Sequence, residues 1–235
     1  MGLLKDVFSI FKKSELTYKR KIEESDDIFT FYFDKPKDLD WQAGQHGLFT
    51  ITHQKIKNGT HPFTIATSPA EDELSITTKL TGELSAFKQS LSELETGMKI
   101  NMSGPVGSFY LIDSNPALLI AGGVGITPYR AILKQIESEG LNNREIKLLY
   151  ISKPEETIYK KELTDLSTRL SVSVEFITEK SNLYPLIDQF SALHSNNGQY
   201  YIAGSKPFVE SVTNHIKGKG IKKAQIHKDT FLGYK

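Results

Sequence analysis

Residues 121–133 read AGGVGITPYRAIL, a glycine-rich turn set between an apolar run and a helical pattern. Gly123 and Gly125 let the backbone turn sharply and approach a ligand without a Cβ clash. Thr127 is placed to cap the following helix, and Pro128 suits the first helical position. The free N–H groups of such a helix start bind the pyrophosphate of a dinucleotide. The stretch therefore predicts a nucleotide-binding strand–turn–helix unit.

The usual dinucleotide fingerprint is incomplete in this stretch. Pro128 stands in place of its third glycine, and the next predicted strand ends at Ser152 and Lys153 instead of an acidic residue. Taken alone, the stretch leaves open a tight strand-to-helix turn that binds no ligand.

Strand and helix patterns alternate around this unit. Apolar runs predict buried strands, and apolar residues at helical spacing predict the helices between them. Such alternation is typical of a parallel sheet with right-handed crossovers, so we expect an α/β parallel-sheet domain over residues 114–235. The predicted strands are ALLIAGG, EIKLLYIS, VSVEFIT, QYYIAG and AQIHKD, and the predicted helices are residues 128–139, TIYKKELTDL, YPLIDQF and KPFVESVTNHI.

The preceding residues, 14–113, have a different pattern. Six short segments rich in β-branched and aromatic residues are separated by turn residues such as Asn58 and Gly59. Six strands at this spacing predict a small antiparallel β-barrel domain, interrupted by one helix around residues 84–94. The predicted strands are LTYKRKI, IFTFYF, HGLFTI, HPFTIAT, ELSITTKL and MKINMSG.

The composition excludes several classes of protein. Charged residues make up 24% of the chain with a net charge of +1, so the charge balance does not favour a nucleic-acid-binding protein. The chain contains no cysteine, which excludes a disulfide framework and a cysteine-ligated zinc or iron–sulfur site on it. No two histidines have the helical spacing of a metal site, and we interpret Asp72 and Glu73 as a solvated turn. We expect no metal site.

Residues 1–13, MGLLKDVFSIFKK, have an amphipathic helical pattern. One interpretation is an interfacial helix that lies on a membrane or on a partner protein. The other, which we favour, is a terminal helix packed on its own protein. We expect a cytoplasmic protein, with membrane association through this segment as the alternative.

Five motifs follow one another along the chain: HPFT at 61–64, KLTGELS at 79–85, GPVGSF at 104–109, GGVGITP at 122–128 and KDTF at 228–231. In this order they resemble the motifs of the ferredoxin–NADP reductase superfamily. The resemblance covers residues 14–231, and the motif sequences are most similar to those of the dehydrogenase domains of NADPH oxidases and ferric reductases. It implies an FAD-binding barrel followed by a nicotinamide-nucleotide domain.

In the barrel, the resemblance assigns the flavin contacts to two motifs. Thr64 matches the residue that hydrogen-bonds flavin N5, and Phe63 matches an aromatic residue that packs against the flavin. His61, followed by Pro62, stands where many members carry an arginine on the flavin pyrophosphate, and a neutral imidazole is a weaker anion partner than a guanidinium. The same pyrophosphate is assigned to a second group of residues, Lys79, Thr81, Gly82 and Ser85.

In the second domain, the resemblance assigns the NAD(P) pyrophosphate to Gly123, Gly125 and Thr127, with Pro128 beside them. The stretch Ala203, Gly204 and Ser205 matches the position beside the nicotinamide, with Ala203 in place of a cysteine. Phe231 matches a terminal aromatic that covers the flavin, and Tyr234 is its rival for that place.

The function implied is that of an FAD-dependent NAD(P)H oxidoreductase. Hydride passes from the nicotinamide to flavin N5, and electrons then pass to a separate acceptor such as a haem protein, a flavodoxin or ferredoxin, or a ferric chelate. Two alternatives stay open: an obligate reductase subunit of a membrane or multi-protein electron-transfer complex, and a nucleotide-binding module with no redox role. The strand ends at residues 152–153 and 178–180 carry two lysines, no arginine and Glu179, which slightly favours NADH over NADPH.

Overall fold

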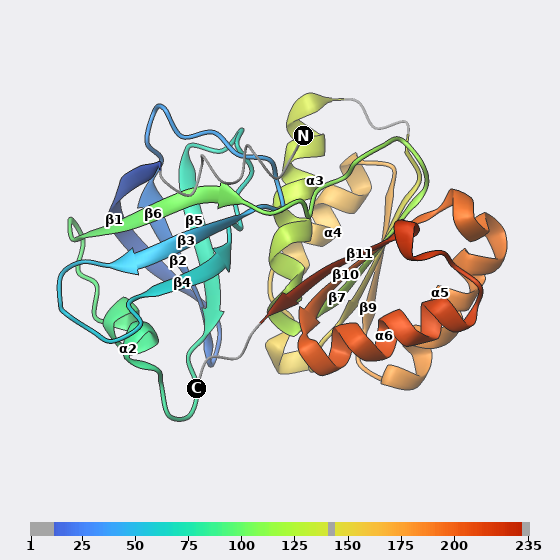
Figure 1. Ribbon diagram of the computed structural model, residues 1–235. Coiled ribbons are helices and arrows are strands. Elements are labelled where there is room, and N and C mark those ends of the chain that lie inside the picture. The colour runs from blue at the N-terminus through green and yellow to red at the C-terminus, as the bar shows by residue number, and fades with distance from the viewer. Residues whose placement is uncertain (1–11, 141–143, 232–235) are drawn as a thin grey trace. The chain divides into compact units, whose positions relative to one another are not determined.

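The computed structural model describes residues 12–140 and 144–231. These residues divide into two compact units, one that ends at Tyr110 and one that begins at Leu111 (Figure 1). Each unit has its own sheet and its own hydrophobic core.

The first unit is built on one six-stranded sheet in which all neighbours are antiparallel, in the order β4-β3-β6-β1-β2-β5. All six predicted strands are confirmed, and so is the single helix. The strands are β1 (Lys13–Ser25), β2 (Ile28–Asp34), β3 (His46–Ile51), β4 (Thr60–Thr64), β5 (Glu73–Lys79) and β6 (Lys99–Val106), and the helix is α2 (Ala86–Ser92).

The two outer strands of this sheet, β4 and β5, are joined by the segment that continues from β4. The N–H of Ala66 donates to the carbonyl of Ser75 at 2.8 Å, and the N–H of Ser75 donates to Thr67 Oγ1 at 3.0 Å. These bonds satisfy edge groups that an open sheet would leave unpaired. The sheet therefore curls into the predicted small barrel, around a core that contains Phe31, Phe49 and other fully buried side chains.

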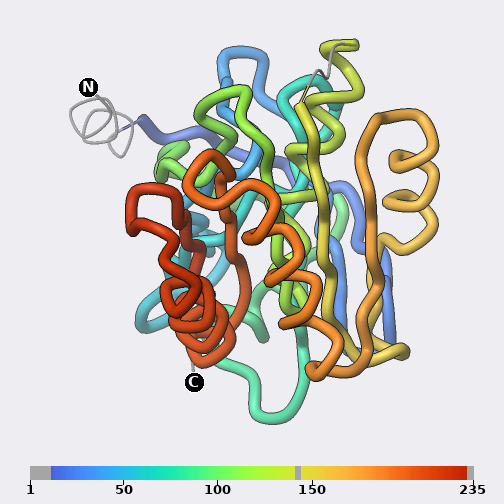
Figure 2. The backbone as a smooth tube through the Cα atoms, turned by 90° about the vertical axis from the view of Figure 1, so that its right-hand side faces the viewer, coloured from blue at the N-terminus to red at the C-terminus, as the bar shows by residue number. Residues whose placement is uncertain are grey.

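The second unit is built on a five-stranded parallel sheet in the order β11-β10-β7-β8-β9, as the strand and helix alternation predicts. Helix α5 packs beside α6, and α3 beside α4 (Figure 2). The strands are β7 (Ala117–Gly122), β8 (Ile146–Ile151), β9 (Val172–Ile177), β10 (Gln199–Ser205) and β11 (Ile226–Phe231), and the helices are α3 (Thr127–Glu139), α4 (Lys160–Arg169), α5 (Lys180–His194) and α6 (Lys206–Gly218).

The order of these strands contains one reversal of direction. The chain moves from β7 outward to β8 and β9, and then returns to place β10 on the other side of β7. At such a reversal the loops that leave the two neighbouring strands diverge, so their carboxyl ends border an open crevice where ligands bind. In this unit the reversal places that position at the carboxyl ends of β7 and β10.

Two expectations about the ends of helices and segments were wrong. Thr127 does not cap α3, because a 3-10 turn over Gly123–Ile126 leads directly into the helix and Thr127 already has helical dihedral angles. Its hydroxyl instead donates to the carbonyl of Val124 at 3.1 Å. Lys13 belongs to β1, where it pairs with Ser103, so the predicted amphipathic segment does not extend to it.

The rest of that segment, residues 1–11, lies outside the described residues, as does Tyr234. Within residues 12–140 and 144–231, none of the helices combines the length and the apolar character that crossing a bilayer requires.

Glu73 is not the solvated turn residue that the sequence suggested, because it begins β5 and joins charges from two other strands. Arg20 on β1 donates two hydrogen bonds of 2.7 Å to its carboxylate, and Lys19 Nζ lies 2.8 Å from Glu73 Oε1 and 3.4 Å from Asp34 Oδ1. The Arg20 guanidinium also lies 4.2 Å above the Tyr32 ring. Hydrogen bonds from Arg20, together with Lys19, lower the pKa of Glu73 from 4.5 to about 2.

We predict that Glu73→Gln destabilises the first unit at pH 7. The lowering of the pKa from 4.5 to about 2 sets an upper limit of about 3.4 kcal/mol. Solvent screening of this partly exposed group reduces the expected loss to roughly 1–2 kcal/mol. Because the folded pKa is depressed, the stabilisation is fully present above pH 4.5 and is lost as the pH falls through about 2.

Urea unfolding as a function of pH measures this difference. The matched control is Glu23→Gln, which removes a carboxylate from an exposed position of β1. Equal stabilities of the Glu73→Gln variant and the parent protein at pH 7 would contradict the prediction.

Candidate functional site

The first candidate site lies along β4, where alternate side chains point to opposite faces. His61 and Phe63 share one face, and both contact Phe87 of α2, with ring centroids 4.5 Å and 5.5 Å from the Phe87 ring. Phe63 also meets Phe49 edge to face at 6.0 Å, so its ring packs against the barrel core. The structure thus brings two of the predicted flavin residues together on α2.

Thr64 lies on the other face of β4 from these two residues, with its neighbour on that face, Pro62, exposed. Thr64 is the last residue of the strand, is only 6% exposed, and pairs with His46 of β3. The predicted hydroxyl is therefore set apart from His61 and Phe63 by the strand itself.

A cavity of about 670 Å³ opens beside the start of β4. It brings His61 together with Ser85, two residues that the sequence assigned to the same phosphate. Its other lining residues were not predicted as site residues; only the turn signal of Asn58 and Gly59 marked the loop. They are Lys57, Asn58, Gly59, Thr60, Ala86 and Phe87.

The charge of the His61 imidazole in this cavity is determined mainly by its burial. Desolvation lowers the pKa of His61, Lys88 lowers it further by charge repulsion, and a hydrogen bond to the backbone of Asn58 opposes both. The imidazole is therefore neutral at pH 7. Burial also lowers the pKa of Lys88, whose Nζ donates to the carbonyl of Lys79 at 2.8 Å.

Of the remaining predicted flavin residues in this unit, Lys79 ends β5, and Thr81, Gly82 and Ser85 lie in the turn between β5 and α2. Ser85 is the N-cap of α2, and its Oγ accepts a hydrogen bond from the N–H of Lys88 at 3.4 Å. Gly82 has a positive φ of 66°, which favours glycine, and both it and Thr81 are exposed and do not line the cavity. With its hydroxyl, imidazole and ammonium groups, the cavity suits a phosphate-bearing group such as FAD.

The second candidate site is the glycine-rich turn at the end of β7. Gly123 has a positive φ of 56° with no atom near its Cβ position, so its role is conformational. Gly125 is different, because a Cβ there would lie 2.3 Å from the carbonyl oxygen of Ala203 on β10. The turn thus lies directly against the neighbouring strand, closer than any side chain would allow.

The other predicted residues of this unit lie at the same edge of the sheet. Ala203, Gly204 and Ser205 end β10, and Ser205 pairs with Phe231, the last residue of β11. Gly204 has a φ of 152°, and a Cβ there would lie 2.9 Å from the ring of Phe208. The structure therefore gathers the predicted nucleotide residues at the carboxyl edge, beside the reversal of strand order, which is where a dinucleotide fits.

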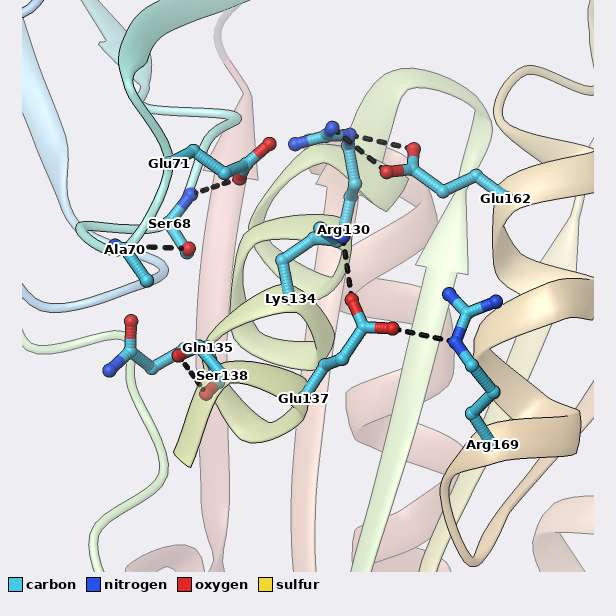
Figure 3. A network of polar contacts seen from close by, with 10 residues as sticks. All are labelled: Ser68, Ala70, Glu71, Arg130, Lys134, Gln135, Glu137, Ser138, Glu162 and Arg169. Carbon is cyan, nitrogen blue, oxygen red and sulfur yellow. Dashed lines mark hydrogen bonds and ion pairs between the residues drawn. The ribbon is translucent and has the colours of Figure 1, made fainter. Parts of the chain in front are cut away.

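Helix α3 is held firmly behind this turn. The hydroxyl of the fully buried Tyr129 donates to the carbonyl of Ile120 on β7 at 3.2 Å, and burial raises the pKa of this phenol. Arg130 donates two hydrogen bonds, of 2.8 Å and 2.9 Å, to the carboxylate of Glu162 on α4 (Figure 3). These contacts fix the start of α3 against β7 and α4.

A second group of ion pairs lies further along α3. Glu137 lies 2.6 Å from Lys134 Nζ and 2.7 Å from Arg169 Nε of α4 (Figure 3). The Lys134–Glu137 pair lies within α3, and the Glu137–Arg169 pair joins α3 to α4. Figure 3 also shows a turn of the first unit between β4 and β5. The N–H of Ser68 donates to Glu71 Oε2 at 2.7 Å and stabilises this turn.

Two lysines follow the ends of β8 and β9, and each has a side-chain partner. Lys153 Nζ lies 3.3 Å from Glu156 Oε1, and Ser152 Oγ lies 2.7 Å from Thr157 Oγ1. Lys180 Nζ lies 3.5 Å from Ser211 Oγ, within α5 and α6. Neither lysine is held toward the crevice by these contacts.

Both units match known domain families. The FAD-binding domain family matches residues 11–110, and the oxidoreductase NAD-binding domain family matches residues 119–214. The chain therefore belongs to the superfamily of FAD- and NAD(P)-binding oxidoreductases that includes ferredoxin–NADP reductase.

Individual relatives are more distant. The toluate 1,2-dioxygenase electron transfer component of Pseudomonas putida is 29% identical over 161 residues, which cover 64% of this chain and 47% of that protein. The ferredoxin reductase component of the 3-ketosteroid-9-alpha-monooxygenase of Rhodococcus rhodochrous is 26% identical over 229 residues, covering 92% and 64%. This chain thus spans about half to two thirds of the length of these curated relatives.

Among solved structures, ferredoxin–NADP⁺ reductase from Plasmodium falciparum has the same fold. It matches with a TM-score of 0.81 at 17% identity, covering 96% of this chain and 99% of that one.

We predict that Gly125→Ala destabilises the second unit by about 2–3 kcal/mol, because its methyl group would meet backbone that cannot move aside. The control is Gly218→Ala at the end of α6, where a Cβ meets nothing within 4 Å. That substitution is expected to stabilise by up to about 1 kcal/mol. Thermal unfolding of both variants measures the effect, and a Gly125→Ala variant as stable as the parent would contradict the close approach.

Proposed function

We propose that this protein is an FAD-dependent NAD(P)H oxidoreductase that passes electrons to a separate acceptor. The observation that carries the proposal is the presence, in one chain, of an FAD-binding domain and a NAD-binding domain whose glycine turn borders the reversal of strand order. A bound FAD would supply a centre that accepts a hydride and releases electrons one at a time.

In the first domain, we assign Thr64 to hold flavin N5 through its hydroxyl, at the end of β4. His61, Pro62 and Phe63 are assigned to the flavin along the same strand. Lys79, Thr81, Gly82 and Ser85 are assigned to its pyrophosphate. Their support is the cavity that His61 and Ser85 line, and the family resemblance for the others.

In the second domain, we assign the NAD(P)H pyrophosphate to the turn that contains Gly123 and Gly125, followed by Thr127 and Pro128 at the start of α3. The nicotinamide is assigned to the end of β10, residues 203–205. Phe231 is assigned to the place that the nicotinamide must enter, so its ring has to move when the nucleotide binds.

The acceptor is proposed to be a redox protein. The relatives from Pseudomonas putida and Rhodococcus rhodochrous are named as the electron transfer and reductase components of oxygenase systems, which supports a ferredoxin or an oxygenase protein as the class of acceptor. The same names support the alternative of an obligate subunit with little free turnover. In that case the purified protein alone would reduce artificial acceptors slowly.

We predict that the purified protein is yellow, with one FAD per chain, and that NADH or NADPH reduces the flavin under anaerobic conditions. Thr64→Ala is expected to slow that reduction on the order of 10²-fold, because it removes a donor held at the reacting atom. The control is Thr50→Ala, an exposed hydroxyl on β3 that bonds Thr60. Stopped-flow absorbance measures the rate. Unchanged reduction in the Thr64→Ala variant would remove Thr64 from the mechanism.

We also predict that kcat/KM is higher for NADH than for NADPH. Lys153 is paired with Glu156, and Glu179 at the start of α5 would repel a 2′-phosphate. Glu179→Gln should narrow the difference, whereas Glu175→Gln, on the exposed side of β9, should not. A preference for NADPH of about tenfold or more, equivalent to about 1.4 kcal/mol, would contradict the prediction.

A further inference from the structure

The cavity of the first unit lies at one end of β4, and Thr64 lies at the other. It is lined by the first two residues of the strand and by the turn before them, residues 57–59. A strand rises about 3.3 Å per residue, so the two strand residues in the cavity wall lie about 10 Å and about 13 Å along the strand from Thr64. On the proposed function, on which this inference rests, an FAD whose flavin lies at Thr64 and whose chain follows β4 reaches the cavity with its adenosine phosphate half.

This cavity has one source of formal charge in its wall. Lys57 is the only lysine, arginine or carboxylate among its described lining residues, and the burial of His61 keeps that side chain neutral. Lys57 has no ion pair or hydrogen bond with another described residue. Nearby Lys88 is already bonded to the carbonyl of Lys79 at 2.8 Å. A cavity with hydroxyls, an imidazole and one uncommitted ammonium group fits an anion.

The turn that carries Lys57 is held in place before any ligand binds. Ile56 packs against the barrel core, and the N–H of Ile51 donates to the carbonyl of Gly59 at 2.9 Å. Asn58 has a positive φ of 56°, which reverses the chain directly after Lys57. The backbone of Lys57 is therefore fixed at the cavity while its side chain stays exposed.

We propose that Lys57 binds the adenosine-side phosphate of FAD in this cavity and so makes the protein select FAD over FMN. FMN shares the flavin, the ribityl chain and the first phosphate with FAD, and it lacks the adenosine half. Lys57 thus supplies the positive charge for the phosphate, which the neutral His61 side chain does not supply.

The test is flavin binding by the full-length protein after its flavin has been removed. Quenching of flavin fluorescence gives the dissociation constants for FAD and for FMN without any turnover. Lys57→Met, which keeps an unbranched side chain one atom shorter and removes the charge, should weaken FAD binding about tenfold and leave FMN binding unchanged. Lys57→Arg should retain most of the affinity for FAD.

The matched control is Lys55→Met, two residues earlier in the same loop and also exposed, but not in the cavity wall. It should bind both flavins as the parent protein does. Raising the salt concentration should weaken FAD binding less in Lys57→Met than in the parent, since the screened ion pair is already gone. Far-UV circular dichroism confirms that each variant is folded.

Two results would overturn the proposal. Lys57→Met could bind FAD as tightly as the parent and Lys55→Met do, or it could lose affinity for FAD and FMN equally. A parent protein that binds neither flavin would instead refute the proposed function itself. The failures of the two proposals are therefore distinguishable in one set of titrations.

Discussion

The close approach between Gly125 and the carbonyl oxygen of Ala203 determines the geometry of the second unit. A Cβ at position 125 would lie 2.3 Å from that oxygen, so only glycine lets the turn after β7 lie on the end of β10. Because β7 and β10 are neighbours on either side of the reversal of strand order, this contact places the turn after β7 against the end of β10, at the edge where such folds bind ligands. Tyr129 and Arg130 then hold the start of α3 behind the turn. The turn's backbone is thus fixed before a nucleotide binds.

In the first unit, the candidate site is positioned by the strand β4 and not by a turn. Phe87 of α2 packs against both His61 and Phe63, which ties the helix to one face of β4 and leaves the cavity at the start of the strand. The alternation of side chains puts Thr64 on the opposite face. The strand β4 therefore presents the imidazole of His61 to the cavity at its start and the hydroxyl of Thr64 on its opposite face at its end. A flavin nucleotide is long enough to use both.

The sequence predicts the elements well because each has a local cause. Apolar runs and helical spacing identify every strand and helix of the α/β unit, and turn residues separate the barrel strands. The sequence does not predict contacts between residues that are far apart along the chain. Glu73 reads as a solvated turn residue, and only the barrel brings Arg20 and Lys19 to it. Lys57 carries no periodic signal either, since its place in a cavity wall follows from how the turn meets α2. Thr127 was mistaken for a cap because the preceding 3-10 turn has no sequence signature.

The two candidate sites share a shortage of positive charge. In the first, His61 is neutral and Lys88 is bonded to a carbonyl. In the second, Lys153 is paired with Glu156 and Lys180 is bonded to Ser211. On the proposed function, Lys57 is the one lysine or arginine among the described residues that line the first cavity, and a phosphate in the second site is bound by backbone N–H groups and hydroxyls. Because such donors are fixed in direction, they distinguish nucleotides by the positions of their oxygen atoms more than by their total charge. On the proposed function, a nucleotide with one more phosphate gains little from this protein, whereas a dinucleotide that follows the backbone turn gains most.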